Sequence, residues 1–424
     1  MKYFTEEFVT GGTHIDMSQF KEVELVGALM KYKAERKIFW DRIGIGGSIT
    51  AAPLIYNNTI YIGAHDKNFY AITLNGTEKW RFRTDGSISN YAAAKDGIIY
   101  FGCTDGNVYA LNESGKIMWR FKTNGIVQAS PTVHNGRLYI GSGDSNMYAL
   151  EARTGKTIWV FHTNGFQTSP LVYNNRIYFG YRDNNLYCTD MNGNLVWKFP
   201  AAANVAAFPP AERNGVIYFG SWDRHCYAVD ATTGSLVWKF EAGDVAYPPT
   251  IHENKLYFGS RDGNVYCLDA DTGSLVWKFR TGGFVVGPVF YKGVIYAGSY
   301  DNNVYAIDSS GKEIWRFRTN GFVTYTTPHE DRLYFGSWDC NLYAVNAETG
   351  ELLWKFKTSI GTPSSIEPPE TSEIKTIETI WQAEEEQKPE EKKEEVRLSD
   401  YGKIESDYTA GLSKDYIKGK KGYV

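Results

Sequence analysis

The sequence predicts an all-β protein, an eight-bladed β-propeller built from four-stranded antiparallel blades. Trp recurs at intervals of 38 to 41 residues, at positions 40, 80, 119, 159, 197, 238, 277, 315 and 354. Between these tryptophans, short runs rich in aromatic and β-branched residues alternate with turn residues, and no run has helical periodicity. Repeats of roughly 40 residues that each contain four strands are typical of propeller blades.

The first repeat shows how the four strands of each blade are predicted. We expect strands at 49–56, 59–63, 68–73 and 78–83, with the first two joined by an Asn-Asn turn. Alternation of apolar and polar residues indicates a strand, and short turns rich in Asn and Gly indicate antiparallel hairpins.

Two further columns of the repeat fix the number of blades at eight. A glycine closes each second strand, and a tyrosine stands two residues before it. The glycines are Gly63, Gly102, Gly141, Gly180, Gly220, Gly259, Gly298 and Gly336, and the tyrosines are Tyr61, Tyr100, Tyr139, Tyr178, Tyr218, Tyr257, Tyr296 and Tyr334.

The repeated tryptophans are expected to pack between neighbouring blades. Each ring would lie flat and donate its N–H to a backbone carbonyl, while a hairpin glycine such as Gly234 supplies a positive φ. Stacking on nucleic acid is the alternative role, but recurrence in register with the hairpins favours packing. Nine tryptophans for eight units leave two candidates to complete the last blade, 37–43 and 352–358. We predict 352–358, because a short Thr-Gly hairpin links it to its partner strand.

Composition points to a cytoplasmic protein without a membrane span. The formal net charge is −4, and no basic surface expected of a nucleic-acid-binding protein is present. The sequence has no apolar run of about 18 residues, and its start lacks the apolar segment of a secretory signal. The five cysteines stand singly, which favours a reducing compartment.

Both ends depart from the repeat, so we predict four segments. Residues 1–35 are expected to contain one helix, serving either as a cap on the propeller or as a partner-binding helix. The propeller spans 36–358, and 359–398 is a charged Pro/Glu/Lys linker with the composition of a disordered segment. The last segment, 399–424, is a disordered tail whose four tyrosines either occur by chance or belong to docking motifs.

The repeat resembles the PQQ-like (pyrroloquinoline quinone) β-propeller family, in its BamB-like non-catalytic branch. The resemblance rests on the family's Trp-docking motif, which is intact at 149–159, 228–238 and 344–354, and it covers about residues 36 to 358. The family includes quinoprotein dehydrogenases as well as scaffolds. The dehydrogenases hold the quinone and calcium with residues from long inter-blade insertions, and the even repeat spacing leaves no room for such insertions. The resemblance therefore implies no cofactor and no metal here.

An Asp precedes a turn in all eight units, and an Asn follows two residues later in seven of them. Asp-x-Asn also begins calcium loops, but the later glutamate ligand is missing. Asp and Asn stabilise tight turns, so we predict a structural role for these residues.

The residue before each turn Asp changes from unit to unit, so the scaffold does not dictate it. In order, this varying column reads His65, Thr104, Gly143, Arg182, Trp222, Arg261, Tyr300 and Trp338. We expect these positions to be exposed on one face, around the mouth of the central channel. Aromatic residues and Arg are typical of binding hot spots. The predicted partner-binding rim is therefore His65, Arg182, Trp222, Arg261, Tyr300 and Trp338. Ordinary packing of loop side chains at the edge of the blades is the alternative role for this column.

The segments that link the blades should add polar and aromatic residues to the same face. The predicted channel-mouth residues are Asn90, Tyr91, Gln128, Tyr247 and Tyr325. The sequence thus predicts a non-enzymatic scaffold that binds a protein or peptide partner, with docking through the C-terminal tail as an additional route. A small-molecule sensor at the channel mouth and a PQQ-dependent oxidoreductase are the alternatives.

Overall fold

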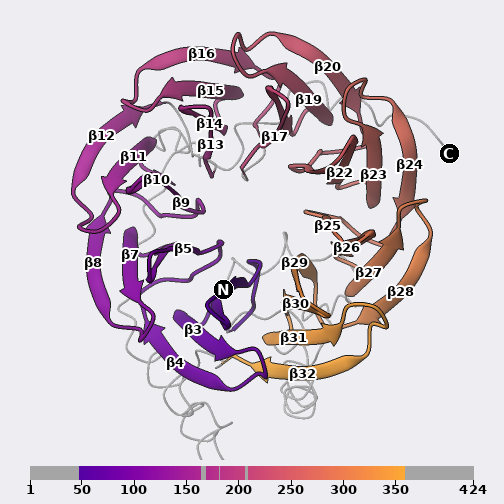
Figure 1. Cartoon of the computed structure of the whole chain (residues 1–424), viewed down its shortest axis with the longest axis horizontal. Coiled ribbons are helices and arrows are strands. Elements are labelled where there is room, and N and C mark those ends of the chain that lie inside the picture. Colours follow the sequence, from indigo (N-terminus) through magenta and orange to yellow (C-terminus); the bar gives the residue numbers. More distant parts are fainter. Residues whose placement is uncertain (1–46, 164–168, 181, 206–208, 359–424) are drawn as a thin grey trace, which may run out of the picture. The chain divides into compact units, whose positions relative to one another are not determined.

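The chain folds into a closed ring of eight four-stranded antiparallel sheets, as the sequence predicts (Figure 1). The computed structural model describes residues 47–163, 169–180, 182–205 and 209–358. In every blade the four strands follow one another in chain order, from the axis of the ring to its perimeter. No helix in this described part is long and apolar enough to cross a membrane.

The first four blades contain strands β1 to β16. Blade 1 comprises β1 (Leu54–Tyr56), β2 (Thr59–Gly63), β3 (Asn68–Thr73) and β4 (Glu78–Arg83). Blade 2 comprises β5 (Ala93–Lys95), β6 (Ile98–Gly102), β7 (Asn107–Asn112) and β8 (Ile117–Lys122). Blade 3 comprises β9 (Thr132–His134), β10 (Arg137–Ser142), β11 (Asn146–Glu151) and β12 (Thr157–His162). Blade 4 comprises β13 (Leu171–Tyr173), β14 (Arg176–Gly180), β15 (Asn185–Asp190) and β16 (Leu195–Pro200).

The other four blades contain strands β17 to β32. Blade 5 comprises β17 (Ala211–Arg213), β18 (Val216–Gly220), β19 (His225–Asp230) and β20 (Leu236–Glu241). Blade 6 comprises β21 (Thr250–His252), β22 (Lys255–Gly259), β23 (Asn264–Asp269) and β24 (Leu275–Arg280). Blade 7 comprises β25 (Val289–Tyr291), β26 (Val294–Gly298), β27 (Asn303–Asp308) and β28 (Glu313–Arg318). Blade 8 comprises β29 (Val323–His329), β30 (Arg332–Ser337), β31 (Asn341–Asn346) and β32 (Leu352–Lys357).

The innermost strand of the first blade is shorter than predicted. The sequence suggested 49–56, whereas β1 covers only three residues, Leu54–Tyr56. Pro53 stands directly before β1 and has no N–H to donate to a sheet. The preceding residues pair with another blade instead, since the backbone N–H of Ile49 donates to the carbonyl of Ser337 at 3.1 Å. The first two strands meet in the expected Asn-Asn turn, in which Asn57 and Asn58 both have positive φ.

Each blade holds the next one through a tryptophan on its outermost strand. The Trp238 indole N–H of blade 5 donates to the carbonyl of Ala270 in blade 6 at 3.0 Å. Its ring lies on Gly273, where a Cβ would come within 2.7 Å of the indole, and the φ of +72° at this glycine also disfavours a side chain. The other seven indoles repeat the bond, from Trp80, Trp119, Trp159, Trp197, Trp277, Trp315 and Trp354 to the following blade.

The ring closes between blades 8 and 1. The C-terminal strand β32 pairs with β31, which confirms the prediction that 352–358 completes the last blade. Its Trp354 donates to the carbonyl of Leu74 in blade 1 at 3.0 Å. At the inner end, the hydroxyl of Thr327 donates to the carbonyl of Pro53 at 2.7 Å. Trp40, the other candidate, lies outside the described residues.

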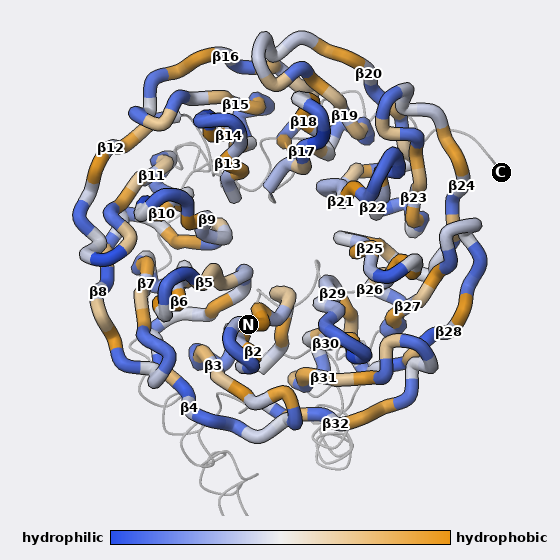
Figure 2. Tube along the Cα trace, in the orientation of Figure 1, coloured by the Kyte–Doolittle hydropathy of each residue, from blue (hydrophilic) through white to orange (hydrophobic). Residues whose placement is uncertain are grey.

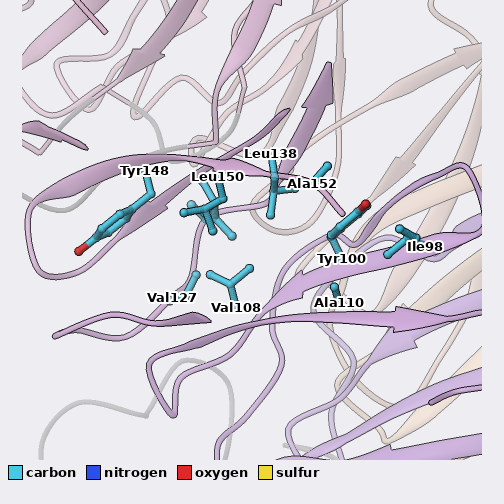
Figure 3. Close-up of a cluster of buried hydrophobic side chains, with 11 residues drawn as sticks. Ile98, Tyr100, Val108, Ala110, Val127, Leu138, Tyr148, Leu150 and Ala152 are labelled. Carbon is cyan, nitrogen blue, oxygen red and sulfur yellow. The ribbon is translucent and has the colours of Figure 1, made fainter. Parts of the chain in front are cut away.

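The hydrophobic core lies between blades rather than within them. One cluster combines Ile98, Tyr100 and Val108 of blade 2 with Leu138 and Leu150 of blade 3 (Figure 3). A side chain of this core is therefore sandwiched between two sheets, so each blade depends on both of its neighbours.

The outermost strands leave apolar side chains in contact with solvent. Figure 2 shows apolar stretches along β12, β16, β20 and β24 at the perimeter. Leu236 and Val237 on β20 are 48% and 49% exposed. Exposed apolar residues of this kind recur around the perimeter, so they distinguish no single side of the ring.

The predicted N-terminal helix, the linker and the tyrosine-containing tail lie outside the described residues. The segment boundaries predicted at 35, 358 and 398 stay predictions.

Candidate functional site

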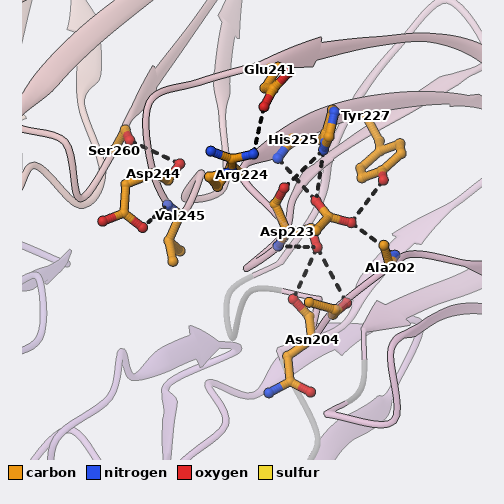
Figure 4. A network of polar contacts seen from close by, with 12 residues as sticks. Ala202, Asn204, Asp223, Arg224, His225, Tyr227, Glu241, Asp244, Val245 and Ser260 are labelled. Carbon is orange, nitrogen blue, oxygen red and sulfur yellow. Dashed lines mark hydrogen bonds and ion pairs between the residues drawn. The ribbon is translucent and has the colours of Figure 1, made fainter. Parts of the chain in front are cut away.

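The eight turn aspartates stabilise the fold through hydrogen bonds that their carboxylates accept. In blade 5, the Asp223 carboxylate accepts hydrogen bonds from the His225 backbone N–H at 3.0 Å, the Tyr227 hydroxyl at 2.8 Å and the Ala202 backbone N–H at 2.9 Å (Figure 4). Arg224, between Asp223 and His225, has a φ of +74°. The carboxylate thus ties its own turn to the segment that arrives from blade 4, which agrees with the predicted structural role.

The same Asp-to-Tyr bond recurs in all eight blades, from the hydroxyls of Tyr70, Tyr109, Tyr148, Tyr187, Tyr227, Tyr266, Tyr305 and Tyr343. The side chains of His, Cys, Asp and Glu form no group of three that could hold a metal ion within the described ranges.

Stability should fall steeply in alkali because of these tyrosines. Burial, followed by the hydrogen bond to Asp144, raises the pKa of Tyr148 to about 12, and burial and Asp262 do the same for Tyr266. The unfolded value is about 10. The contribution of these groups is therefore complete below pH 10 and is lost as the pH rises through the folded pKa values. Urea unfolding at pH 8, 10 and 11 measures the loss, which should be smaller in Tyr148→Phe. A midpoint that does not change over this range would contradict the prediction.

The varying column lies beside the segments that link consecutive blades. The Trp222 backbone N–H donates to the carbonyl of Asn204 at 2.9 Å, and the Trp338 N–H donates to that of Phe322 at 2.9 Å. In these blades, the loop between the second and third strands therefore lies on the same face of the ring as the link that leads into the blade. This arrangement was predicted from the repeat.

On blades 4 to 6, two arginines flank an exposed tryptophan. The guanidinium of Arg182 lies 5.9 Å from the Trp222 ring centroid, and that of Arg261 lies 5.5 Å from it. Arg261 also lies 5.3 Å from the ring of Phe284, in the link between blades 6 and 7. These are cation–π distances, so the side chains form a continuous row.

The row continues through blades 7 and 8 as stacked aromatic rings. Tyr300 lies 5.6 Å from Phe284 and stacks on Phe322 at 4.8 Å with an interplanar angle of 6°. Trp338 lies 5.3 Å from Phe322 and 5.9 Å from Tyr300. We define the aromatic arc as Arg182, Trp222, Arg261, Phe284, Tyr300, Phe322 and Trp338.

The side chains of the arc are not all exposed, although the sequence predicts that the whole rim is. Trp222 is 43% exposed and Phe284 is 37% exposed, and Arg182 is exposed as well. Arg261, Tyr300 and Trp338 are only half-buried, because they pack on one another and on the two phenylalanines. The accessible part of the arc is therefore its blade 4 to 6 section, centred on Trp222.

The remaining rim positions do not join the arc. His65 is half-buried with its Nε2 3.2 Å from the Thr50 hydroxyl, and burial lowers its pKa. The Thr104 hydroxyl accepts a hydrogen bond from the Ser87 backbone N–H at 2.7 Å. Gly143 has no side chain to contribute. The aromatic arc is thus confined to blades 4 to 8.

The predicted channel-mouth residues differ in exposure, from buried Tyr325 to exposed Gln128. Tyr325 is only 8% exposed, and its ring lies 5.0 Å from that of Tyr91 in an edge-on arrangement. Tyr247 and Asn90 are half-buried, whereas Gln128 is exposed. Tyr91 comes from the link into blade 2 and Tyr325 from β29 of blade 8, so residues of non-adjacent blades meet here.

Sequence reasoning missed Phe284 and Phe322. Each follows the last glycine of a link, in Gly-Gly-Phe and Asn-Gly-Phe. In other links this place holds Ser87 and Ile126, so it is a second column whose residue varies. Comparing that column across the repeats would have revealed both rings.

Comparison with known proteins identifies the repeat. A family model described as outer membrane protein assembly factor BamB matches residues 22–113, 75–205, 164–249, 182–284, 223–355 and 261–385. No curated protein matches the chain.

Two solved structures have a similar fold. The computationally designed Ika8 protein is 16% identical with a TM-score of 0.64, over 72% of this chain and 98% of its own. BamB from Moraxella catarrhalis is 18% identical with a TM-score of 0.60, over 68% of this chain and 94% of its own. At such identities the likeness concerns the fold alone. The family-model matches, however, together span most of the chain, and the protein therefore belongs to the family of the outer membrane protein assembly factor BamB.

Proposed function

We propose that this protein is a non-enzymatic scaffold that binds a protein or peptide partner on the aromatic arc. The observation that carries the proposal is Trp222, a large ring that is 43% exposed between two arginines. Trp and Arg are the residues most enriched in binding hot spots, and a hot spot is surrounded by contacts that exclude water. Phe284 and the packed rings of blades 7 and 8 supply such surroundings.

The arc also suits a partner because it is pre-organised. The Trp222 and Trp338 backbones are fixed by hydrogen bonds to neighbouring links. Stacking between Tyr300 and Phe322 holds the less exposed end of the arc. A partner would therefore immobilise few side chains on binding, which reduces the entropic cost of association.

The proposal includes a cytoplasmic location. Its support is the five cysteines, which are all buried and stand at scattered positions with no pattern of a disulfide framework. Scattered cysteines of this kind are typical of a reducing compartment. Fractionation of the source cells would test this part, and recovery of the full-length chain outside the cytoplasm would contradict it.

Replacing Trp222 by alanine should weaken partner binding by about 2 kcal/mol or more, roughly 30-fold. Peptides selected from a displayed random library on the full chain provide the ligand, and calorimetric titration provides the affinity. Leu236→Ala is the matched control, because Leu236 is 48% exposed on the outermost strand of the same blade. Equal affinity of the wild type and the Trp222 variant for every selected peptide would refute binding on the arc.

A further inference from the structure

A pocket of about 350 Å³ lies between blades 2 and 3. Its walls come from the β5–β6 turn of blade 2 and from the β9–β10 and β11–β12 turns of blade 3. Successive strands of a blade are antiparallel, so these turns lie on the face opposite the arc. The volume falls within the range typical of small-molecule sites, about 300–1,000 Å³. The charged lining residues are Lys95, Asp96, Glu151 and Arg153.

An ion pair joins the corresponding turns of blades 5 and 6, where the guanidinium of Arg213 lies 2.6 Å from the carboxylate of Asp271. The same two positions of the repeat are Lys95 and Arg153 in blades 2 and 3. Two cations repel each other instead of pairing. The two turns therefore face each other across the pocket without a direct bond between these side chains.

A second difference from other blades is Ile98, the first residue of β6, which lines the pocket. In blades 3, 4 and 8 the second strand begins with Arg137, Arg176 and Arg332 instead. Their guanidinium groups donate to backbone carbonyls of the next blade at 2.6, 2.8 and 2.8 Å. Isoleucine has no donor, so no such bond crosses from β6 to blade 3.

The Tyr100 hydroxyl is a polar group of the pocket that the fold leaves unused. The equivalent hydroxyls of Tyr178, Tyr218 and Tyr296 donate to an alanine carbonyl of the next blade at 3.1, 3.1 and 3.0 Å. The Tyr100 side chain lines the pocket and is only 1% exposed, but its hydroxyl makes no hydrogen bond to another described residue. Figure 3 shows Tyr100 at one end of the interface, together with Ile98 and Ala152. Buried hydroxyls normally have a partner, so a bound molecule is a natural one.

Charges of both signs act on this hydroxyl from the two walls. Burial and then Asp96 of blade 2 raise the pKa of Tyr100 to about 12, whereas Arg153 of blade 3 acts in the opposite direction. Asp96 and Arg153 form no ion pair with each other or with another described residue. A compact molecule with one positive and one negative group would therefore complement both walls at once.

The other lining residues narrow the class of ligand. Ile98, Val133 and Ala152 add an apolar wall, which suits an aliphatic group. A simple anion would meet the two cations but also the carboxylates of Asp96 and Glu151. The Glu151 carboxylate already accepts a hydrogen bond from the Thr154 hydroxyl at 2.6 Å, which leaves Asp96 as the acceptor for a ligand cation.

We propose that this pocket binds a free α-amino acid with an aliphatic side chain. Its carboxylate would lie near Lys95 and Arg153, its ammonium group near Asp96 and its side chain against Ile98. The Tyr100 hydroxyl would donate to the carboxylate. No residue of the aromatic arc lines the pocket, so this inference does not depend on the proposed function, and the failure of either leaves the other intact.

Titration calorimetry on the full-length chain tests the proposal with L-leucine, N-acetyl-L-leucine and L-leucinamide. The first derivative lacks the ammonium group and the second lacks the carboxylate. We expect leucine to bind at least about tenfold more tightly than either derivative, because each lacks one charge-assisted contact. Equal binding of N-acetyl-L-leucine would show a simple anion site and overturn the proposal. The absence of leucine binding would overturn it as well.

Two variants locate the binding in the pocket. Tyr100→Phe keeps the ring and should weaken leucine binding by about three- to tenfold. Its matched control is Tyr178→Phe, which removes a hydroxyl already bonded to Ala231 and should leave leucine affinity unchanged. Arg153→Asp recreates the charge pattern of Arg213 and Asp271, so it should abolish leucine binding without lowering the melting midpoint of the unliganded chain. Wild-type affinity in both Tyr100→Phe and Arg153→Asp would place the site elsewhere and contradict the proposal.

Discussion

Replacing Trp238 by alanine should lower the free energy of unfolding by about 3 kcal/mol. The ring fills the space over Gly273, lies 5.7 Å from the ring of Tyr218 and donates to the carbonyl of Ala270. Full burial of the ring would place the loss at the upper end of the range for Trp→Ala. Trp238 is only half-buried, as are most of the eight repeated tryptophans, so the lower end applies.

Chemical unfolding of Trp238→Ala and Trp222→Ala, followed by circular dichroism, measures the difference. Trp222→Ala should remain within about 0.5 kcal/mol of the wild type, because its ring is exposed and its loss opens no core cavity. Equal destabilisation by the two substitutions would show that Trp222 is a packing residue.

The second large effect is expected at Gly220, where the end of β18 passes directly under a link. A Cβ at this position would lie 2.3 Å from the Ala246 carbonyl oxygen and 2.6 Å from that of Tyr247. These are backbone atoms, which cannot turn aside as a flexible side chain can, so Gly220→Ala should cost about 3 kcal/mol. It should also displace the link that carries Tyr247.

Gly215→Asn is the control in the same blade. Gly215 has a φ of +78°, but a Cβ added there would meet no atom within 4 Å, and asparagine tolerates this conformation. The substitution should cost about 1 kcal/mol or less. Comparable unfolding midpoints for the two glycine variants would contradict the steric explanation.

The sequence predicted the fold well because every structural rule is repeated eight times. The turn aspartates, the hairpin glycines and the tryptophans act locally or on the next blade, so their spacing determines blade number and strand order. The inner strand was predicted too long because its apolar residues continue past Pro53, and only the structure shows that Ile49 pairs with Ser337 in another blade.

The functional surface was less predictable because it depends on contacts across blades. Trp222 and Arg261 were identified from a column that varies, but their cation–π geometry depends on the spacing of blades 5 and 6. Phe322 joins Tyr300 and Trp338 only because the link and the loop approach each other on one face.

Protection of a thiol on the arc tests the central claim most directly. All five native cysteines are buried, so a cysteine introduced at an exposed position is the only accessible thiol among the described residues. Arg182→Cys places one on the arc and Leu236→Cys places one on the perimeter. A saturating selected peptide should slow maleimide labelling at position 182 by about tenfold or more and leave position 236 unchanged. Unchanged labelling at position 182 with the peptide fully bound would show that the partner binds elsewhere.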